Sequence, residues 1–228
     1  MPGWVAGLLV SAVLSQLLAI ATAPAQGDDA RIPSRAESPA IVAMSSLPRL
    51  ADSEVLRAPG TAPHVEGPPP AHTGGFGEPT CVECHLGSGV NEPGSTLEIV
   101  GVGRSYRPGE VHEITIRLLS FDMAAAGFQA SFRWARGDRT GESAGTARPL
   151  DGRVAVATSE NGVDYIQHSA AGVPADGEQA EWTFEWTAPR ESGAIVLNVA
   201  ANSGNGDNSP LDDLVYTAEI ELAGSAER

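Results

Sequence analysis

The strongest constraint on the fold is a two-residue alternation of apolar and polar side chains in the second half of the chain. It runs through residues 128–134, 182–186 and 214–222, and shorter stretches at 114–118 and 195–199 continue it. In an extended strand, successive side chains point to opposite faces, so this alternation places apolar groups on one face and polar groups on the other. The pattern predicts half-buried antiparallel strands.

Turn-forming sequences separate these stretches. They are Arg107-Pro108-Gly109, Asp151-Gly152, Asn161-Gly162, Asp176-Gly177 and Ser192-Gly193. Short strands joined by such turns predict an all-β sandwich of seven to nine strands over residues 95–224. A segment of this length can enclose one hydrophobic core. Trp134, Trp182 and Trp186 have the parity of core positions, which favours packing over a ligand-stacking role.

The N-terminal part has a different composition. Residues 1–25 carry no charged side chain, and an apolar run from Val5 to Ala23 ends at the small residues Ala23-Pro24-Ala25. We expect a signal peptide over residues 1–25, and an uncleaved anchor is the alternative because the run could span a bilayer. Residues 26–70 are rich in Pro, Ala and Ser and are expected to form a disordered linker. The mature chain, without a second apolar run, is expected in the periplasm, outside the cell or at its surface.

Charge excludes two classes of partner. The 228 residues contain 14 basic side chains, all arginine, and 29 acidic ones, for a net charge of −15. No cationic surface is therefore expected for nucleic acid or an anionic membrane.

The chemistry is concentrated in Cys81-Val82-Glu83-Cys84-His85. Two thiols at this spacing can each add to one vinyl group of a haem, and the adjacent imidazole can bind the iron. The motif predicts one covalent haem c in an attachment segment at residues 71–94. Cys81 and Cys84 would hold the porphyrin, and His85 would be the proximal iron ligand.

Three other interpretations of the cysteine pair stay open. A thioredoxin-like redox pair would need a βαβ context, whereas glycines surround this motif. A zinc site would need a fourth ligand and a second paired motif. A structural disulfide would leave His85 unexplained.

The second axial ligand of the iron is less constrained. The candidates are ranked His168, then His72, then Met123, and an empty position is the further alternative. His168 follows the stretch Asp164 to Gln167, and Met123 lies between two predicted strands. His64, His112 and Met44 are further candidates, and no spacing rule selects among the six.

Two further expectations are negative. The loop from Asn202 to Asp213 is rich in Asn and Asp, but it lacks the spacing of a calcium loop, and such residues are common in turns. We therefore expect no calcium. No nucleophile elbow or phosphate-binding glycine loop occurs, so the chain is not expected to be an enzyme.

The chain from residue 71 onward resembles the bacterial exported Reelin-type (Reeler-like) domain proteins, in which a haem-attachment motif precedes the sandwich. The matching stretches are AHTGGFGEPTCVECH at 71–85, SYRPGE at 105–110, GFQASF at 127–132, DYIQHS at 164–169, WTFEWTAP at 182–189 and NVAANSGNG at 198–206. The resemblance implies an immunoglobulin-like sandwich, haem attachment at Cys81 and Cys84, and His85 on the iron. It places His168 in the His-Ser element before the Trp-rich strand, where domains without haem look similar.

These observations favour an exported monohaem c-type protein that transfers single electrons. The acidic charge favours a basic redox partner, because complementary fields speed encounter. One alternative is an extracellular adhesion or assembly module with a structural cysteine pair. Another is a haem-based ligand sensor with an open iron site.

Overall fold

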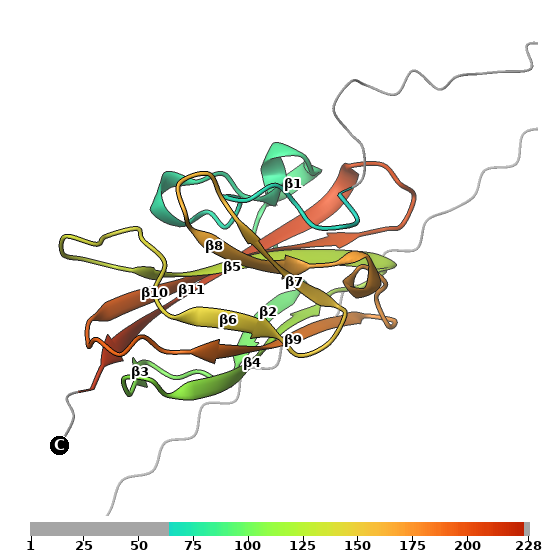
Figure 1. Cartoon of the computed structure of the whole chain (residues 1–228). Helices are drawn as coiled ribbons and strands as arrows, with labels where there is room; N and C mark the ends of the chain where they lie inside the picture. Colours follow the sequence, from blue (N-terminus) through green and yellow to red (C-terminus); the bar gives the residue numbers. More distant parts are fainter. Residues whose placement is uncertain (1–63, 226–228) are drawn as a thin grey trace, which may run out of the picture. The chain divides into compact units, whose positions relative to one another are not determined.

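The structure is a computed structural model that describes residues 64–225. The expected signal peptide at 1–25 and most of the expected linker at 26–70 lie outside the described residues. Within that range the chain forms eleven strands and three short 3₁₀ helices (Figure 1). This exceeds the seven to nine strands expected, in part because β1 (Leu86–Val90) and the two-residue β3 (Ser105–Tyr106) are additional short strands at the edge formed by β11.

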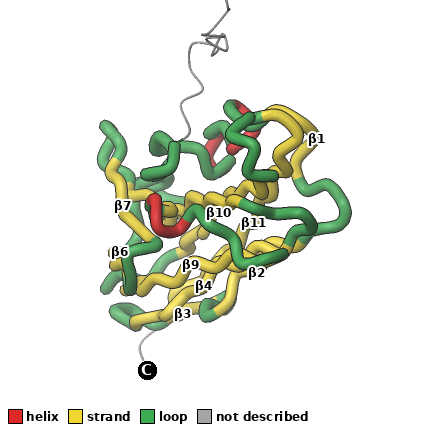
Figure 2. The backbone as a smooth tube through the Cα atoms, turned by 90° about the vertical axis from the view of Figure 1, so that its right-hand side faces the viewer, coloured by secondary structure: helices red, strands yellow, loops and turns green. Residues whose placement is uncertain are grey.

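The strands form two facing sheets (Figures 1 and 2). The larger sheet has the order β1-β11-β10-β5-β8-β7, and β3 also pairs with β11. Its other strands are β5 (Ala125–Trp134), β7 (Val154–Thr158), β8 (Asp164–His168), β10 (Ala194–Gly204) and β11 (Leu211–Gly224). The smaller sheet has the order β2-β4-β9-β6, with β2 (Thr96–Val100), β4 (Val111–Leu119), β6 (Thr146–Pro149) and β9 (Gln179–Thr187). Pairing is antiparallel except for β1 and β3, which run parallel to β11.

The all-β sandwich predicted from the alternation is confirmed. The apolar positions of β5 and β10 in the larger sheet face those of β9 in the smaller sheet, and together they form the core. Phe132 stacks on Trp186 with ring centroids 4.3 Å apart, and Phe128 stacks on Trp182 at 4.7 Å. The three strand tryptophans are buried, which confirms that they pack in the core.

The outer face of the larger sheet is covered, which the alternation alone did not predict. Gln129, Ser131 and Arg133 occupy the polar positions of β5, yet all three are buried. Residues 64–85, called here the covering segment, lie over this face (Figure 1). The side-chain amide of Gln129 donates to the Pro69 carbonyl at 3.0 Å, and its oxygen accepts from the His72 amide at 2.7 Å. The polar stripe therefore binds the covering segment.

Helical structure within residues 64–225 is limited to η1 (Gly75–Gly77), η2 (Cys81–Glu83) and η3 (Ala170–Gly172). No helix in this range is long and apolar enough to cross a membrane.

Candidate functional site

The cysteine motif folds as a single tight turn built on η2. The Thr80 hydroxyl accepts a hydrogen bond from the Val82 amide at 3.4 Å. The Cys81 carbonyl accepts from the amides of Cys84 at 3.2 Å and His85 at 2.8 Å. In a helical turn, residues three and four apart share one side. Cys81, Cys84 and His85 accordingly contribute to the wall of one cavity.

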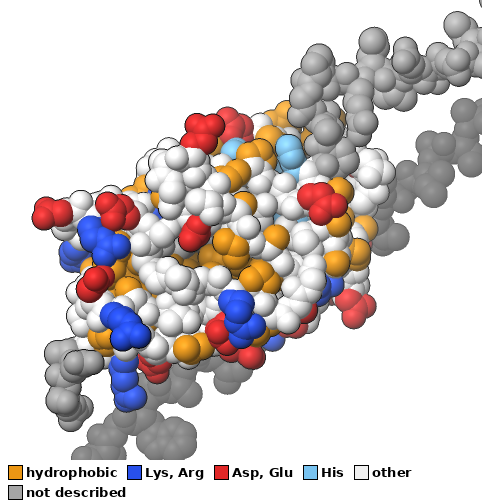
Figure 3. Space-filling view, viewed as in Figure 1, with side chains coloured by type: hydrophobic (Ala, Val, Ile, Leu, Met, Phe, Trp, Pro, Cys, Tyr) orange, Lys and Arg blue, Asp and Glu red, His pale blue; other side chains and the backbone are white. Residues whose placement is uncertain are grey.

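That cavity has a volume of about 210 Å³ and lies between the covering segment and the larger sheet. The sheet contributes the first residues of β5, the last residue of β8 and the loop between β10 and β11. Pro68, Pro69, Ala126 and Phe128 make much of the wall apolar. Figure 3 shows histidine side chains reaching the surface on this upper face of the molecule. The structure thus places His168 and the cysteine motif in the wall of the same cavity.

Both thiols are free. Burial raises the pKa of the Cys81 thiol to about 12, and the neighbouring Cys84 thiol adds to the shift. Redox-active cysteine pairs work through a thiol whose pKa is lowered, so Cys81 has the opposite character. The raised pKa of Cys81 therefore does not favour a thioredoxin-like pair.

His85 is oriented by a buried carboxylate. Its Nδ1 lies 2.5 Å from Oδ2 of Asp213, a β11 residue with only 4% of its surface exposed. The side-chain amide of Asn202 lies 3.3 Å from the same ring nitrogen. With Nδ1–H donating to the carboxylate, Nε2 keeps its lone pair for a metal. Sequence reasoning missed Asp213 as a partner of His85, because it grouped the residue with the oxygen-rich loop.

His168 ends β8 and is 8% exposed. Its Nδ1 accepts from the Phe128 amide at 3.1 Å, which leaves Nε2 to donate to the His64 carbonyl at 3.1 Å. Burial lowers the pKa of His168 below its usual value, and His85 and His64 add to the effect. A Cβ at Gly127 would lie only 2.7 Å from Cε1 of His168, so a glycine makes room for the ring.

The other candidate ligands are placed differently. His72 lines the cavity, but its Nε2 pairs with Glu83 at 2.8 Å and its Nδ1 lies 3.0 Å from the Pro69 carbonyl. Met123 is 5% exposed and belongs to the hydrophobic core, outside the lining of the cavity. His64 also lines the cavity, although the sequence analysis did not rank it among the first three candidate ligands.

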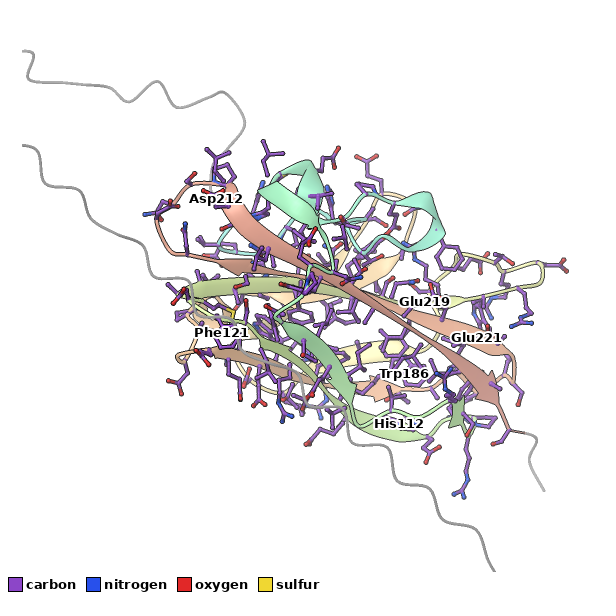
Figure 4. The ribbon with its side chains drawn as sticks, turned by 180° about the vertical axis from the view of Figure 1, so that it is seen from behind. His112, Phe121, Trp186, Asp212, Glu219 and Glu221 are labelled. Carbon is purple, nitrogen blue, oxygen red and sulfur yellow. The ribbon has the colours of Figure 1, made fainter. Side chains whose placement is uncertain are left out.

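His112 is far from the site. It lies against Trp186 with ring centroids 5.6 Å apart, at the end of the molecule opposite Asp212 (Figure 4). Asp212 is the exposed sequence neighbour of Asp213. His112 therefore cannot share a cofactor with the cysteine motif.

The Asn- and Asp-rich loop uses its oxygens internally. Asp207 accepts from the Ser209 amide at 2.7 Å, and Asn205 accepts from the Asp207 amide at 3.0 Å. In the part of the chain from 64 to 225, no group of three or more His, Cys, Asp or Glu side chains is placed to hold a metal ion. The arrangement of the described residues therefore does not favour a zinc site, because it does not bring three possible ligands together.

The residues present fit a covalently bound haem by their chemistry. Two free thiols and an imidazole with an available Nε2 line one largely apolar cavity. A haem iron needs one or two protein ligands, so the absence of a three-residue cluster does not count against it. The cavity volume of about 210 Å³ is below the roughly 300–1,000 Å³ of ligand pockets, so the cavity would enclose only part of such a group.

No protein-family model matches the chain, and no curated protein matches it in sequence. Among solved structures it is similar to the Reelin-N domain of F-spondin, at 16% identity over 64% of this chain and 96% of that one, with a TM-score of 0.42. The human F-spondin reeler domain is similar at 17% identity over 58% and 91%, with a TM-score of 0.38. A cohesin module from a Clostridium perfringens family 33 glycoside hydrolase follows at 15% over 59% and 97%, with a TM-score of 0.40. The sandwich fold is shown by the strand pairing described above.

Proposed function

We propose that the chain is a monohaem c-type protein that transfers single electrons. Cys81 and Cys84 would hold the porphyrin by thioether bonds, and Nε2 of His85 would bind the iron. The observation that carries the proposal is that two free thiols and an imidazole whose Nδ1 contacts a carboxylate line one cavity.

The protein's own residues suit an electron carrier more than an enzyme. The haem would supply a one-electron couple, and its thioether bonds would prevent loss of the group. The apolar lining residues Pro68, Pro69, Ala126 and Phe128 would exclude water from part of the site, and the part of the group left outside the cavity would be open to a partner.

The surroundings of the cavity favour a basic redox partner. Exposed acidic residues adjoin lining residues in sequence at Glu66, Glu83, Asp207 and Asp212. None of the described residues that line the cavity is an arginine. Complementary charge raises the rate of encounter in short-lived complexes, so a cationic protein surface is the expected partner.

A denaturation test decides the haem proposal. The full chain is expressed with a haem-maturation system and unfolded, and the expected result is haem that stays attached with a c-type pyridine haemochrome spectrum. Cys81→Ser with Cys84→Ser should abolish covalent attachment, because no thioether bond can form. Attachment that persists in this double variant, or no haem in the wild type, would refute the proposal.

A second candidate function is an extracellular adhesion or assembly module. The observation that favours it is that the sandwich has a continuous hydrophobic core and that polar contacts with the larger sheet hold the covering segment in place. If the wild type carries no haem under maturation conditions, this candidate replaces the first.

A further inference from the structure

Asp213 is a buried acidic residue in direct contact with His85. Its Oδ2 lies 2.5 Å from Nδ1 of His85, and its Oδ1 is buried without a hydrogen-bond partner in the described structure. A carboxylate with an unpaired buried oxygen costs free energy, on the order of 1–3 kcal/mol or more. A residue that only stabilised the fold would be expected to pair both oxygens.

The backbone sets this contact. Gly87, two residues after His85, pairs with Asp213 where β1 runs parallel to β11. A Cβ at Gly87 would lie 3.0 Å from the Asp213 carbonyl oxygen, so the close approach of the two strands favours a glycine. The amide of Leu86 donates to the Pro210 carbonyl at 2.6 Å on the same strand pair. The residues that follow the cysteine motif thus dock His85 directly on Asp213.

We propose that Asp213 is a positioning residue for the iron ligand and that it lowers the reduction potential of the site. This inference rests on the proposed function. The carboxylate accepts the Nδ1 proton, which fixes the tautomer that offers Nε2 to the metal. Its negative charge makes the imidazole a stronger donor and favours the more positive, ferric state of the iron.

No arginine among the described residues lines the cavity to neutralise the negative charge of Asp213. Among the lining residues of the cavity, Asp213 is the acidic one, and the other titratable groups are histidines and the two thiols. Asn202 contributes a neutral amide. Because the charge is buried, solvent screens it less than it screens the exposed neighbour Asp212.

The test compares two substitutions that remove the same charge. Asp213→Asn keeps the shape and one acceptor oxygen but removes the buried charge. Asp212→Asn removes an exposed charge one residue away, at a backbone φ of 64° that asparagine tolerates. Spectroelectrochemical titration gives the midpoint potential of each haem-loaded protein.

Asp213→Asn should favour the reduced state by about tenfold or more, which is about 59 mV for a one-electron couple. Asp212→Asn should change the same equilibrium less than about threefold, because its charge is exposed to solvent. Equal shifts in the two variants, or no shift in Asp213→Asn, would overturn the proposal.

A second measurement needs neither haem nor a variant. Nitrogen NMR of the histidine rings in the haem-free full chain, at alkaline pH, should show His85 with its proton on Nδ1. A proton on Nε2 would overturn the positioning role. If the wild type attaches no haem, the proposed function fails on that result, while the ring spectra still decide how Asp213 orients His85.

Discussion

His168 has two hydrogen bonds that compete with a role on iron. Its Nδ1 accepts from the Phe128 amide and its Nε2 donates to the His64 carbonyl. Binding a metal through Nε2 would require the proton to move to Nδ1, where the Phe128 carbonyl lies 3.3 Å away and can accept it. The carbonyl of His64 would then lose its donor, and the Phe128 amide would lose its acceptor. Ligation through Nε2 is therefore a route that breaks both of the ring's present hydrogen bonds and offers one new acceptor, the Phe128 carbonyl.

His168→Ala in the haem-loaded protein tests this route. We expect loss of the low-spin, six-coordinate optical spectrum, because the cavity wall would lose its buried neutral imidazole. His72→Ala is the control, since its ring is held by Glu83 and should leave the spectrum unchanged.

An unchanged low-spin spectrum in His168→Ala would contradict the assignment. His64→Ala then tests a further histidine of the cavity wall. If the reduced wild type binds carbon monoxide without displacing any ligand, the second position is open and the sensor alternative is favoured.

The local sequence identified the cysteine motif as a candidate site, but it did not identify the partner of His85. The spacing of Cys81, Cys84 and His85 is a short-range signal, so the motif could be found without a fold. Asp213 could not, because its contact with His85 spans 128 positions and depends on the parallel pairing of β1 with β11. Asp212 and Asp213 are identical in type, and only the strand register makes one exposed and the other buried.

At the scale of elements, the covering segment is attached through a buried ion pair. Arg133 on β5 contacts the Glu78 carboxylate and the Tyr165 hydroxyl, and the Arg133 and Glu78 side chains are 5% and 12% exposed. Burial lowers the pKa of Arg133, and Tyr165 opposes that shift. Loss of Glu78 would leave a buried cation with fewer partners, which is costly.

Glu78→Ala should lower the free energy of unfolding by about 3–5 kcal/mol, the range for removing one partner of a buried ion pair. Glu83→Ala is the matched control in the same segment, because its side chain is 58% exposed where it pairs with His72. Exposed pairs contribute about 0–1 kcal/mol. Urea denaturation followed by circular dichroism measures both, and equal losses would show that the buried pair does not hold the segment.

The strands themselves were predictable because their signal is local. Alternation located β4, β5, β9, β10 and β11, and the turn sequences separated them. The covering of the larger sheet was not predictable, because Gln129 and Arg133 have the alternation of a solvent-facing stripe. Their partners lie in a Gly- and Pro-rich stretch that has no periodicity of its own.

At the scale of the molecule, the acidic charge of −15 acts as a long-range field. Its reach depends on salt, since the screening length falls from about 30 Å at 0.01 M to about 10 Å at 0.1 M. A cationic electron acceptor should therefore be attracted at low salt and lose that advantage as salt rises.

Stopped-flow rates of the reduced haem protein with hexaammineruthenium, a trivalent cation, should fall several-fold over that salt range. Rates with the anion ferricyanide should rise instead. Glu66→Gln with Asp212→Asn should weaken the cationic dependence more than Glu113→Gln with Glu160→Gln, because the first pair adjoins the cavity lining. Equal effects of the two pairs would show that only the total charge matters.

The pairing of β1 with β11 also sets an order of events during synthesis. His85 precedes its partner Asp213 by 128 positions, and β11 is the last strand of the described chain. Bringing together two strands that are so far apart in sequence is slow, and the N-terminal part of a chain leaves the ribosome first. The two cysteines therefore emerge well before the strand that encloses them can form. A maturation enzyme that attaches haem to the thiols would therefore act on them before β11 has paired with β1. Formation of that pair would then complete the cavity around the modified cysteines.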